Sequence, residues 1–153
     1  MTIKVTLEKN LLPPTFFIIC ILMAIIFNFA YSIYIVTYPT NLLGIIILLL
    51  GLYLSKKGSD QFQKADTNIN TFDEPDKLIT NGLFKYTRNP MYLGFAISLL
   101  GVAVILGTIQ SLIIFIFFIM ITDQWYIKFE EQMMVTKFGS EYKSYMKRTR
   151  KWL

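Results

Sequence analysis

Polar and aromatic residues that could bind a charged ligand gather at two boundaries between polar and apolar sequence. The first is the run from Gly82 to Gly94, Gly-Leu-Phe-Lys-Tyr-Thr-Arg-Asn-Pro-Met-Tyr-Leu-Gly, where a polar loop passes into an apolar segment. The second is the pair Glu130 and Glu131, at the end of a later apolar segment. Charged groups held at a membrane-water boundary suit a protein that brings a water-soluble, charged cofactor to a substrate dissolved in lipid.

The apolar segment that follows the first run is expected to begin as an anion-binding helix end. Asn89 is placed to cap this helix and Pro90 to occupy its first turn. The N–H groups at a helix start attract carboxylates and phosphates, and Arg88 stands beside them. An alternative interpretation is an interfacial anchor, made of aromatic and basic residues that face lipid headgroups: Phe84, Lys85, Tyr86, Arg88 and Tyr92.

Four apolar segments must position these residues. The 153-residue chain is 54% hydrophobic, with a mean hydropathy of +0.50, which is typical of an integral membrane protein. The apolar segments cover residues 15–36, 41–54, 91–106 and 109–127. We therefore expect an all-α membrane protein with about four transmembrane helices. Small residues at Gly44 and Gly51, and at Gly94, Ser98 and Gly101, are spaced for close contacts between helices.

The basic residues predict the orientation of the chain in the membrane. All fifteen Lys and Arg residues lie in the N-terminal segment, the middle loop up to residue 88, or the region after residue 127. The two short turns between paired segments carry none. Because cytoplasmic loops are enriched in Lys and Arg, we expect both termini in the cytoplasm, with the protein in a plasma or inner membrane.

The chain divides into two expected parts. Residues 1–57 form an N-terminal transmembrane hairpin, and residues 58–153 form a cofactor-binding region with two transmembrane helices and an amphipathic tail. Gly139 is expected to break that tail into two short helices. The basic residues of the tail would attract anionic lipids, which accounts for the net charge of +5 without a nucleic-acid partner.

The residue types that are missing limit the chemistry. The sequence contains no histidine, and its one cysteine, Cys20, lies within the first apolar segment. No metal site is therefore expected, and any reaction must proceed without a histidine base. The oligomeric state is not predicted.

The run from Gly82 to Gly94 resembles a signature of the isoprenylcysteine carboxyl methyltransferase and phospholipid methyltransferase superfamily. In that signature a glycine precedes an aromatic stretch, Arg-His-Pro-x-Tyr and a further glycine. The pair Glu130-Glu131, with Phe-Gly-Ser-Glu-Tyr at residues 138–142 and then Tyr145, resembles its second signature. The resemblance covers about half of the chain. It implies a cytoplasm-facing pocket for S-adenosylmethionine in the C-terminal half, mostly enclosed by protein and open to the bilayer.

The resemblance also implies which residues bind the cofactor. Leu78 and Ile79 would lie along it through backbone groups, and Phe84 would pack near it. The remaining positions are Asn89, Pro90, Met91, Tyr92, Glu130 and Glu131, to which the helix-start argument adds Arg88. No catalytic residue is assigned.

Two positions depart from the family pattern. Asn89 stands where the family has histidine, so this position cannot move a proton by titrating. Tyr126 stands where isoprenylcysteine methyltransferases carry an arginine that faces the substrate carboxylate, which argues against a prenylcysteine substrate. Asp123 is the acidic residue within the last apolar segment. We hypothesise that Asp123 and Tyr126 border a substrate tunnel.

The sequence therefore predicts a membrane methyltransferase that uses S-adenosylmethionine and acts on a lipophilic or lipid-linked acceptor. The acceptor group stays open between a carboxylate, an amine, a thiol and a phenol. One alternative is a sterol-type membrane reductase that uses NADPH and has a similar C-terminal cofactor region. Another is a non-catalytic membrane protein of the same fold.

Overall fold

The computed structural model describes residues 11–30, 32–68, 73 and 76–153. Its α-helices are α2 (Pro13–Ala30), α3 (Leu43–Lys64), α4 (Pro90–Leu106), α5 (Ile109–Ile121) and α6 (Lys128–Arg148). Short 3-10 turns, η1 (Thr40–Leu42) and η2 (Gly82–Lys85), lie between helices, and a π-helical turn, η3 (Thr122–Ile127), joins α5 to α6. No strand of a β-sheet occurs among these residues. The all-α prediction is confirmed.

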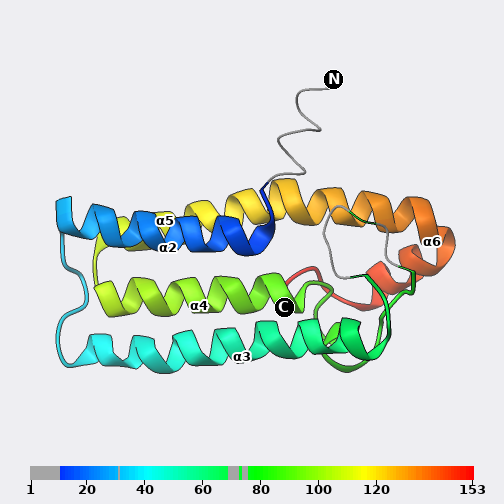
Figure 1. The fold of residues 1–153 in the computed structure, drawn as a ribbon, viewed down its shortest axis with the longest axis horizontal. Helices are drawn as coiled ribbons and strands as arrows, with labels where there is room; N and C mark the ends of the chain where they lie inside the picture. The colour runs from blue at the N-terminus through cyan, green and yellow to red at the C-terminus, as the bar shows by residue number, and fades with distance from the viewer. Residues whose placement is uncertain (1–10, 31, 69–72, 74–75) are drawn as a thin grey trace, which may run out of the picture.

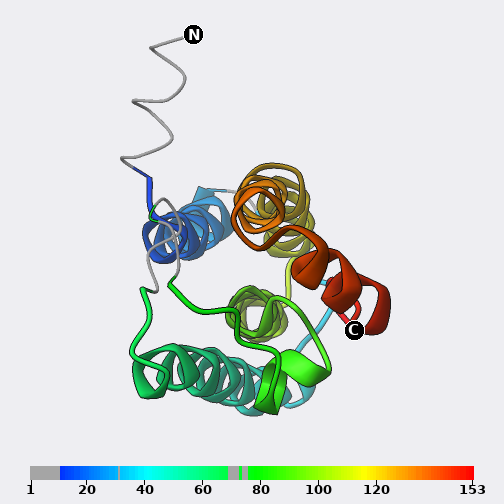
Figure 2. The same cartoon turned by 90° about the vertical axis from the view of Figure 1, so that its right-hand side faces the viewer.

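Helix α4 lies inside the bundle. Figure 1 shows α4 between α3 on one side and the layer of α2 and α5 on the other, and Figure 2 shows the same arrangement along the bundle. Helix α4 contacts α2, α3 and α5. Its buried residues include Leu93, Gly94, Ala96 and Leu99, which lie on different sides of the helix. A helix that is apolar all round is typical of a buried position. The neighbouring helices therefore hold α4 in place, including its start.

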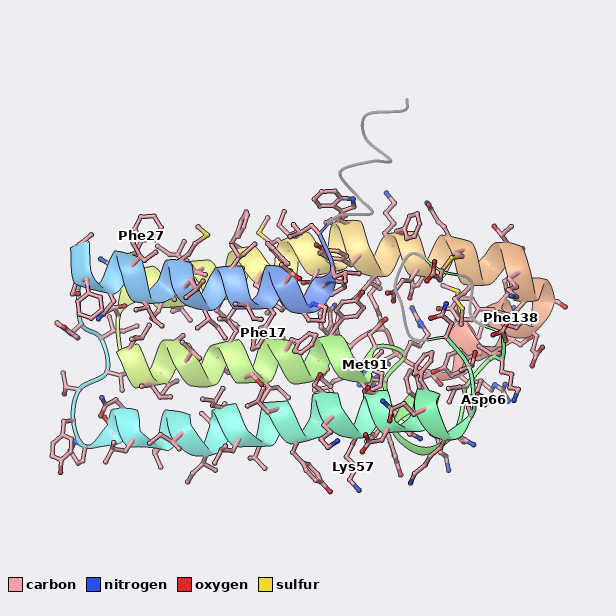
Figure 3. All side chains as sticks on the ribbon, viewed as in Figure 1. Phe17, Phe27, Lys57, Asp66, Met91 and Phe138 are labelled. Carbon is pink, nitrogen blue, oxygen red and sulfur yellow. The ribbon has the colours of Figure 1, made fainter. Side chains whose placement is uncertain are left out.

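The expected membrane class is supported by the helices. Three helical stretches are long and apolar enough to cross a membrane, Pro13–Ala30, Thr40–Lys64 and Ile109–Arg148, and the shorter α4 is apolar throughout. Phe17 stacks on Phe95 of α4 at 4.8 Å between ring centroids, whereas Phe27 on the same helix points away from the bundle (Figure 3). An apolar exterior of this kind suits a lipid environment. The side of the membrane on which each terminus lies stays a prediction.

Two helices end at positions other than the ends of their apolar segments. Helix α2 ends at Ala30, not at residue 36, because the following backbone bonds to the turn between α4 and α5. The N–H groups of Ile35 and Val36 donate to the Gly107 carbonyl at 2.7 and 3.1 Å. Helix α3 continues to Lys64, well past residue 54, and runs through position 57 without a break. The division of the chain at that position stays a prediction.

Glycines allow α3 and α4 to pack with their backbones close together. A Cβ atom at Gly51 would lie 2.4 Å from the backbone N of Ser98, and one at Gly94 would lie 2.4 Å from the backbone N of Ser55. Real Cβ atoms do not approach so closely. The expected close contact between helices is therefore confirmed, and it holds the start of α4 against α3.

Replacing Gly51 with alanine is expected to lower the free energy of unfolding by about 1–3 kcal/mol, the usual cost of overpacking. The matched control is Leu50→Ala, one residue earlier on the lipid-facing side of α3, where 60% of the residue is exposed. Lipid tails can replace the contacts that this control loses. Unfolding of both variants in detergent measures the difference. Equal destabilisation of the two would contradict the packing argument.

Helices α5 and α6 form one long rod that turns back on itself near its end. The π-helical turn η3 lies in its middle, and Gly139 interrupts α6 with φ 53° and ψ −120°. A positive φ of this size favours glycine. Figure 1 shows the end of α6 folded back toward the start of α4. The expected break of the tail at Gly139 is confirmed.

Candidate functional site

A pocket lies where the start of α4, the first half of α6, η2 and the end of α3 come together. Its cavity volume is about 70 Å³, which is smaller than the range of about 300–1,000 Å³ that is usual for small-molecule sites. We call it the main pocket. Nine of the ten residues expected to bind a cofactor line it: Ile79, Phe84, Arg88, Asn89, Pro90, Met91, Tyr92, Glu130 and Glu131. In Figure 3 the labelled Met91 marks this end of the bundle.

The tenth expected residue, Leu78, does not line the main pocket. It borders a neighbouring hollow between the end of α3 and the loop before η2. Its side chain packs against the same hydrophobic cluster as Ile79 and Phe84. The expected contact between the backbone of Leu78 and a cofactor stays a prediction.

A hydrogen bond joins the two boundaries singled out in the sequence. The hydroxyl of Tyr92, in the first turn of α4, donates to Oε1 of Glu130, in the first turn of α6, at 2.7 Å. Tyr92 is only 4% exposed. This bond fixes the orientation of a carboxylate at the wall of the main pocket.

Arg88 and Glu131 form a nearly buried ion pair beside that bond. Nε and Nη2 of Arg88 donate to Oε1 of Glu131 at 3.0 and 2.5 Å. Nη1 donates to the carbonyls of Met146 and Thr149 at 3.3 and 2.6 Å. Each guanidinium nitrogen thus donates within the protein, and Arg88 ties the start of α6 to its end. A direct role for Arg88 in holding a ligand stays a prediction.

Asn89 does not cap α4 as expected. Asn89 occupies the position before the helix, but its side chain makes no capping hydrogen bond. The side-chain amide instead donates to the Lys151 carbonyl at 2.9 Å. The Asn89 side chain therefore bonds to a residue far along the chain and not to the local backbone that a cap would bind. Pro90 occupies the first turn of α4, as predicted.

Asp123 and Tyr126 lie in η3 and do not line the main pocket. Oδ1 of Asp123 accepts hydrogen bonds from Nζ of Lys151 at 3.0 Å and from Nε1 of Trp152 at 2.8 Å. The hydroxyl of Tyr126 donates to the Leu11 carbonyl at 2.9 Å. The ring of Tyr126 lies 6.3 Å from that of Tyr92, between centroids. Their expected place beside a substrate tunnel stays a prediction.

A second, apolar hollow adjoins the main pocket. It lies between the start of α2, the middle of α3 and the start of α4, and we call it the side hollow. Its lining includes Leu12, Pro13, Pro14, Leu52, Ser55, Lys56, Ser59 and Phe95. Met91, Tyr92 and Glu130 line both the side hollow and the main pocket. The oriented carboxylate of Glu130 therefore stands where the main pocket and the side hollow share a wall.

Sequence reasoning missed several residues of the site. The main pocket is also lined by Phe62, Asn68, Asp73, Met133, Met134, Tyr142 and Tyr145. Tyr142 and Tyr145 lie in the second signature, so their motif was a usable signal. Tyr145 is fixed by a hydrogen bond from its hydroxyl to the Phe84 carbonyl at 2.5 Å. Among the described residues, no group of three or more His, Cys, Asp or Glu side chains is placed to hold a metal ion.

Comparison with known families decides the class of the chain. The pattern of the phospholipid methyltransferase family matches residues 39–141. That span is more than half of the chain and includes both boundaries that meet at the main pocket. The chain belongs to the phospholipid methyltransferase family.

Proteins similar to this chain occur in two yeasts and in a bacterium. The Protein-S-isoprenylcysteine O-methyltransferase of Schizosaccharomyces pombe is 32% identical over 123 residues, which cover 79% of this chain and 50% of the relative. The enzyme of the same name from Saccharomyces cerevisiae is 30% identical over 119 residues, 76% of this chain and 49% of the relative. The chain thus spans about half the length of these two relatives. An uncharacterized protein of Haemophilus influenzae is 36% identical over 63 residues, 41% of this chain and the whole of that protein.

Proposed function

We propose that the protein is an integral-membrane methyltransferase that uses S-adenosylmethionine and acts on a lipophilic acceptor. One observation carries the proposal: the main pocket and the side hollow share a wall made of Met91, Tyr92 and Glu130. A reaction between a charged donor and an apolar acceptor needs two adjoining cavities. Each reactant occupies its own cavity, and the two meet only at the reacting atoms. Membership of the phospholipid methyltransferase family supports the same class of reaction.

The residue types of the main pocket suit the proposed cofactor, and the cavity of about 70 Å³ would have to widen to admit it. The Glu130 carboxylate suits an ammonium group or ribose hydroxyls, since charge-assisted hydrogen bonds are strong. Phe84 and Tyr142, 5% and 4% exposed, offer aromatic surface for an adenine ring. The methionines Met133 and Met134 add adaptable apolar surface. When bound, S-adenosylmethionine would supply a methyl group that is already activated for displacement.

The protein then has to align the acceptor, exclude water and take up any proton that the acceptor loses. Alignment alone can contribute several kcal/mol to a displacement. Besides Glu130, the carboxylates of this region are Asp73, which lines the main pocket, Glu131, which pairs with Arg88, and Asp123, which is bound by Lys151 and Trp152. Glu130 is the one that reaches both cavities. For an amine, thiol or phenol acceptor, we assign the uptake of the proton to Glu130.

S-adenosylhomocysteine, the product form of the cofactor, is expected to raise the melting temperature of the detergent-purified protein. At about 100 times its Kd a ligand adds roughly 2.7 kcal/mol of stability, or about 5–10 °C for a chain of this size. NADPH at equal concentration is the control and should cause no shift. A shift with NADPH alone would support a sterol-type reductase. No shift with either would support a non-catalytic protein.

Filling the side hollow is expected to block the acceptor without weakening cofactor binding. Leu52→Trp places a large ring in the hollow, whereas Leu50→Trp adds the same ring to the lipid-facing side of α3. We expect Leu52→Trp to lower methyl transfer to a lipid extract by about tenfold or more, as loss of alignment does. The mass shift of the extract after incubation with labelled cofactor measures this and identifies the acceptor. Equal activity of the two variants would remove the side hollow from the proposal.

A further inference from the structure

The last residues of the chain run along the segment that precedes α4. We call residues 149–152 the C-terminal strap. The N–H of Arg88 donates to the Arg150 carbonyl at 2.9 Å, and Thr87 and Arg150 form an isolated parallel bridge. The Lys151 carbonyl accepts from Oγ1 of Thr87 at 3.2 Å and from the amide of Asn89 at 2.9 Å. Figure 1 shows this end of the chain beside the start of α4.

The same strap also reaches η3. Nζ of Lys151 lies 3.0 Å from Oδ1 of Asp123, and Nε1 of Trp152 donates to the same oxygen at 2.8 Å. The Trp152 side chain packs against the main hydrophobic core. Lys151 is thus used within the protein and not only as part of a basic surface. Two donors on one carboxylate oxygen make Asp123 the anchor of the strap.

The strap therefore bonds to the two segments that lead into α4 and α6. Thr87 to Asn89 precede the first turn of α4, which carries Tyr92, and η3 precedes the first turn of α6, which carries Glu130. Neither set of bonds involves a residue of the shared wall itself. A segment tied to both helix starts fixes the separation and rotation of the two walls.

We propose that the C-terminal strap sets the geometry of the cofactor site, with Asp123 as a positioning residue that acts through Lys151 and Trp152. This inference rests on the proposed function. It assigns to Asp123 a role different from the expected substrate contact, because its carboxylate is held by the strap. The Asn89 side-chain amide also holds the strap, at the start of α4, because it donates to the Lys151 carbonyl.

Loosening of the strap can be measured on the ligand-free, full-length protein. Trypsin cleaves after Lys and Arg, and the strap carries Arg150 and Lys151. We expect Asp123→Ala to speed cleavage at these two residues several-fold. Intact mass spectrometry of the protein in detergent measures the cleavage. Asp60→Ala, which removes a carboxylate from an exposed ion pair on α3, is the matched control and should not change the rate. Unchanged cleavage in Asp123→Ala would overturn the inference.

The effect on the site is measured separately, as binding of S-adenosylhomocysteine. We expect Asp123→Ala to raise its Kd about tenfold, the equivalent of one charged hydrogen bond. Trp152→Phe, which removes one N–H and keeps an aromatic ring, should raise it less. Asp123→Asn keeps an acceptor for Trp152 and should recover part of the affinity. The KM for the methyl donor should rise in parallel, with kcat changed less.

The outcomes separate this inference from the proposed function. A looser strap with unchanged Kd and KM would overturn the positioning role and leave the methyltransferase proposal intact. A fall in melting temperature with the same Kd would likewise reduce the strap to a stabilising contact. Failure of the unmodified protein to bind S-adenosylhomocysteine would overturn both, whatever the cleavage rates.

Discussion

Replacing Glu130 with glutamine is expected to reduce methyl transfer by about a hundredfold or more, the lower end of what a positioned proton acceptor contributes. Glutamine keeps the size of the side chain and can still accept a hydrogen bond from the Tyr92 hydroxyl, which now reaches Oε1 of Glu130. It removes the negative charge that an ammonium group would meet and the capacity to take up a proton. The loss is therefore chemical and not a loss of packing.

Initial rates with labelled cofactor and a lipid extract measure this loss, and the melting shift with S-adenosylhomocysteine measures the binding part of it. Glu141→Gln, at an exposed position of the same helix, is the matched control. Tyr92→Phe should have a smaller effect, since it removes one hydrogen bond to the carboxylate but keeps the negative charge of Glu130. Full activity and full affinity in Glu130→Gln would remove Glu130 from the site and leave the shared wall without a chemical role.

The sequence predicted the main helices for physical reasons, whereas the meeting of the two polar boundaries was implied by the family resemblance. Apolar segments must be helical in a membrane, since each backbone group needs a partner. Pro90 starts a helix because its ring sets φ and its missing N–H costs nothing there. Gly139 breaks α6 because only glycine tolerates its backbone angles readily. In each case the signal lies in the residue itself or in its immediate neighbours.

The features that the sequence did not reveal depend on partners far along the chain. Residues 33–36 are as apolar as α2, and only their bonds to Gly107 and Ile109 show that the helix has ended. Asn89 has the right type for a cap, but the Lys151 carbonyl takes its amide. The side hollow is lined mainly by residues such as Leu52 and Phe95, whose types signal nothing beyond burial. Tertiary contacts override local preference at each of these points.

Removing the guanidinium of Arg88 is expected to be the most destabilising single change in the site. The side chains of Arg88 and Glu131 are only 9% and 14% exposed. Breaking a buried ion pair by removing one partner costs about 3–5 kcal/mol, because the other charge is left without compensation. Arg88→Met also deletes the donors to the Met146 and Thr149 carbonyls. We therefore expect a loss of about 3 kcal/mol or more in the free energy of unfolding.

A second substitution distinguishes the ion pair from a ligand contact. The double variant Arg88→Met with Glu131→Leu removes both charges, so it should recover part of the stability lost in Arg88→Met. Lys56→Met is the control, because it breaks an exposed pair with Asp60 and should cost less than about 1 kcal/mol. Unfolding in detergent without ligand gives all three values. If Arg88 served chiefly to bind the cofactor carboxylate, Arg88→Met would weaken binding of S-adenosylhomocysteine and leave the ligand-free stability unchanged. A large loss of ligand-free stability would instead show that Arg88 builds the pocket by holding α6 in place.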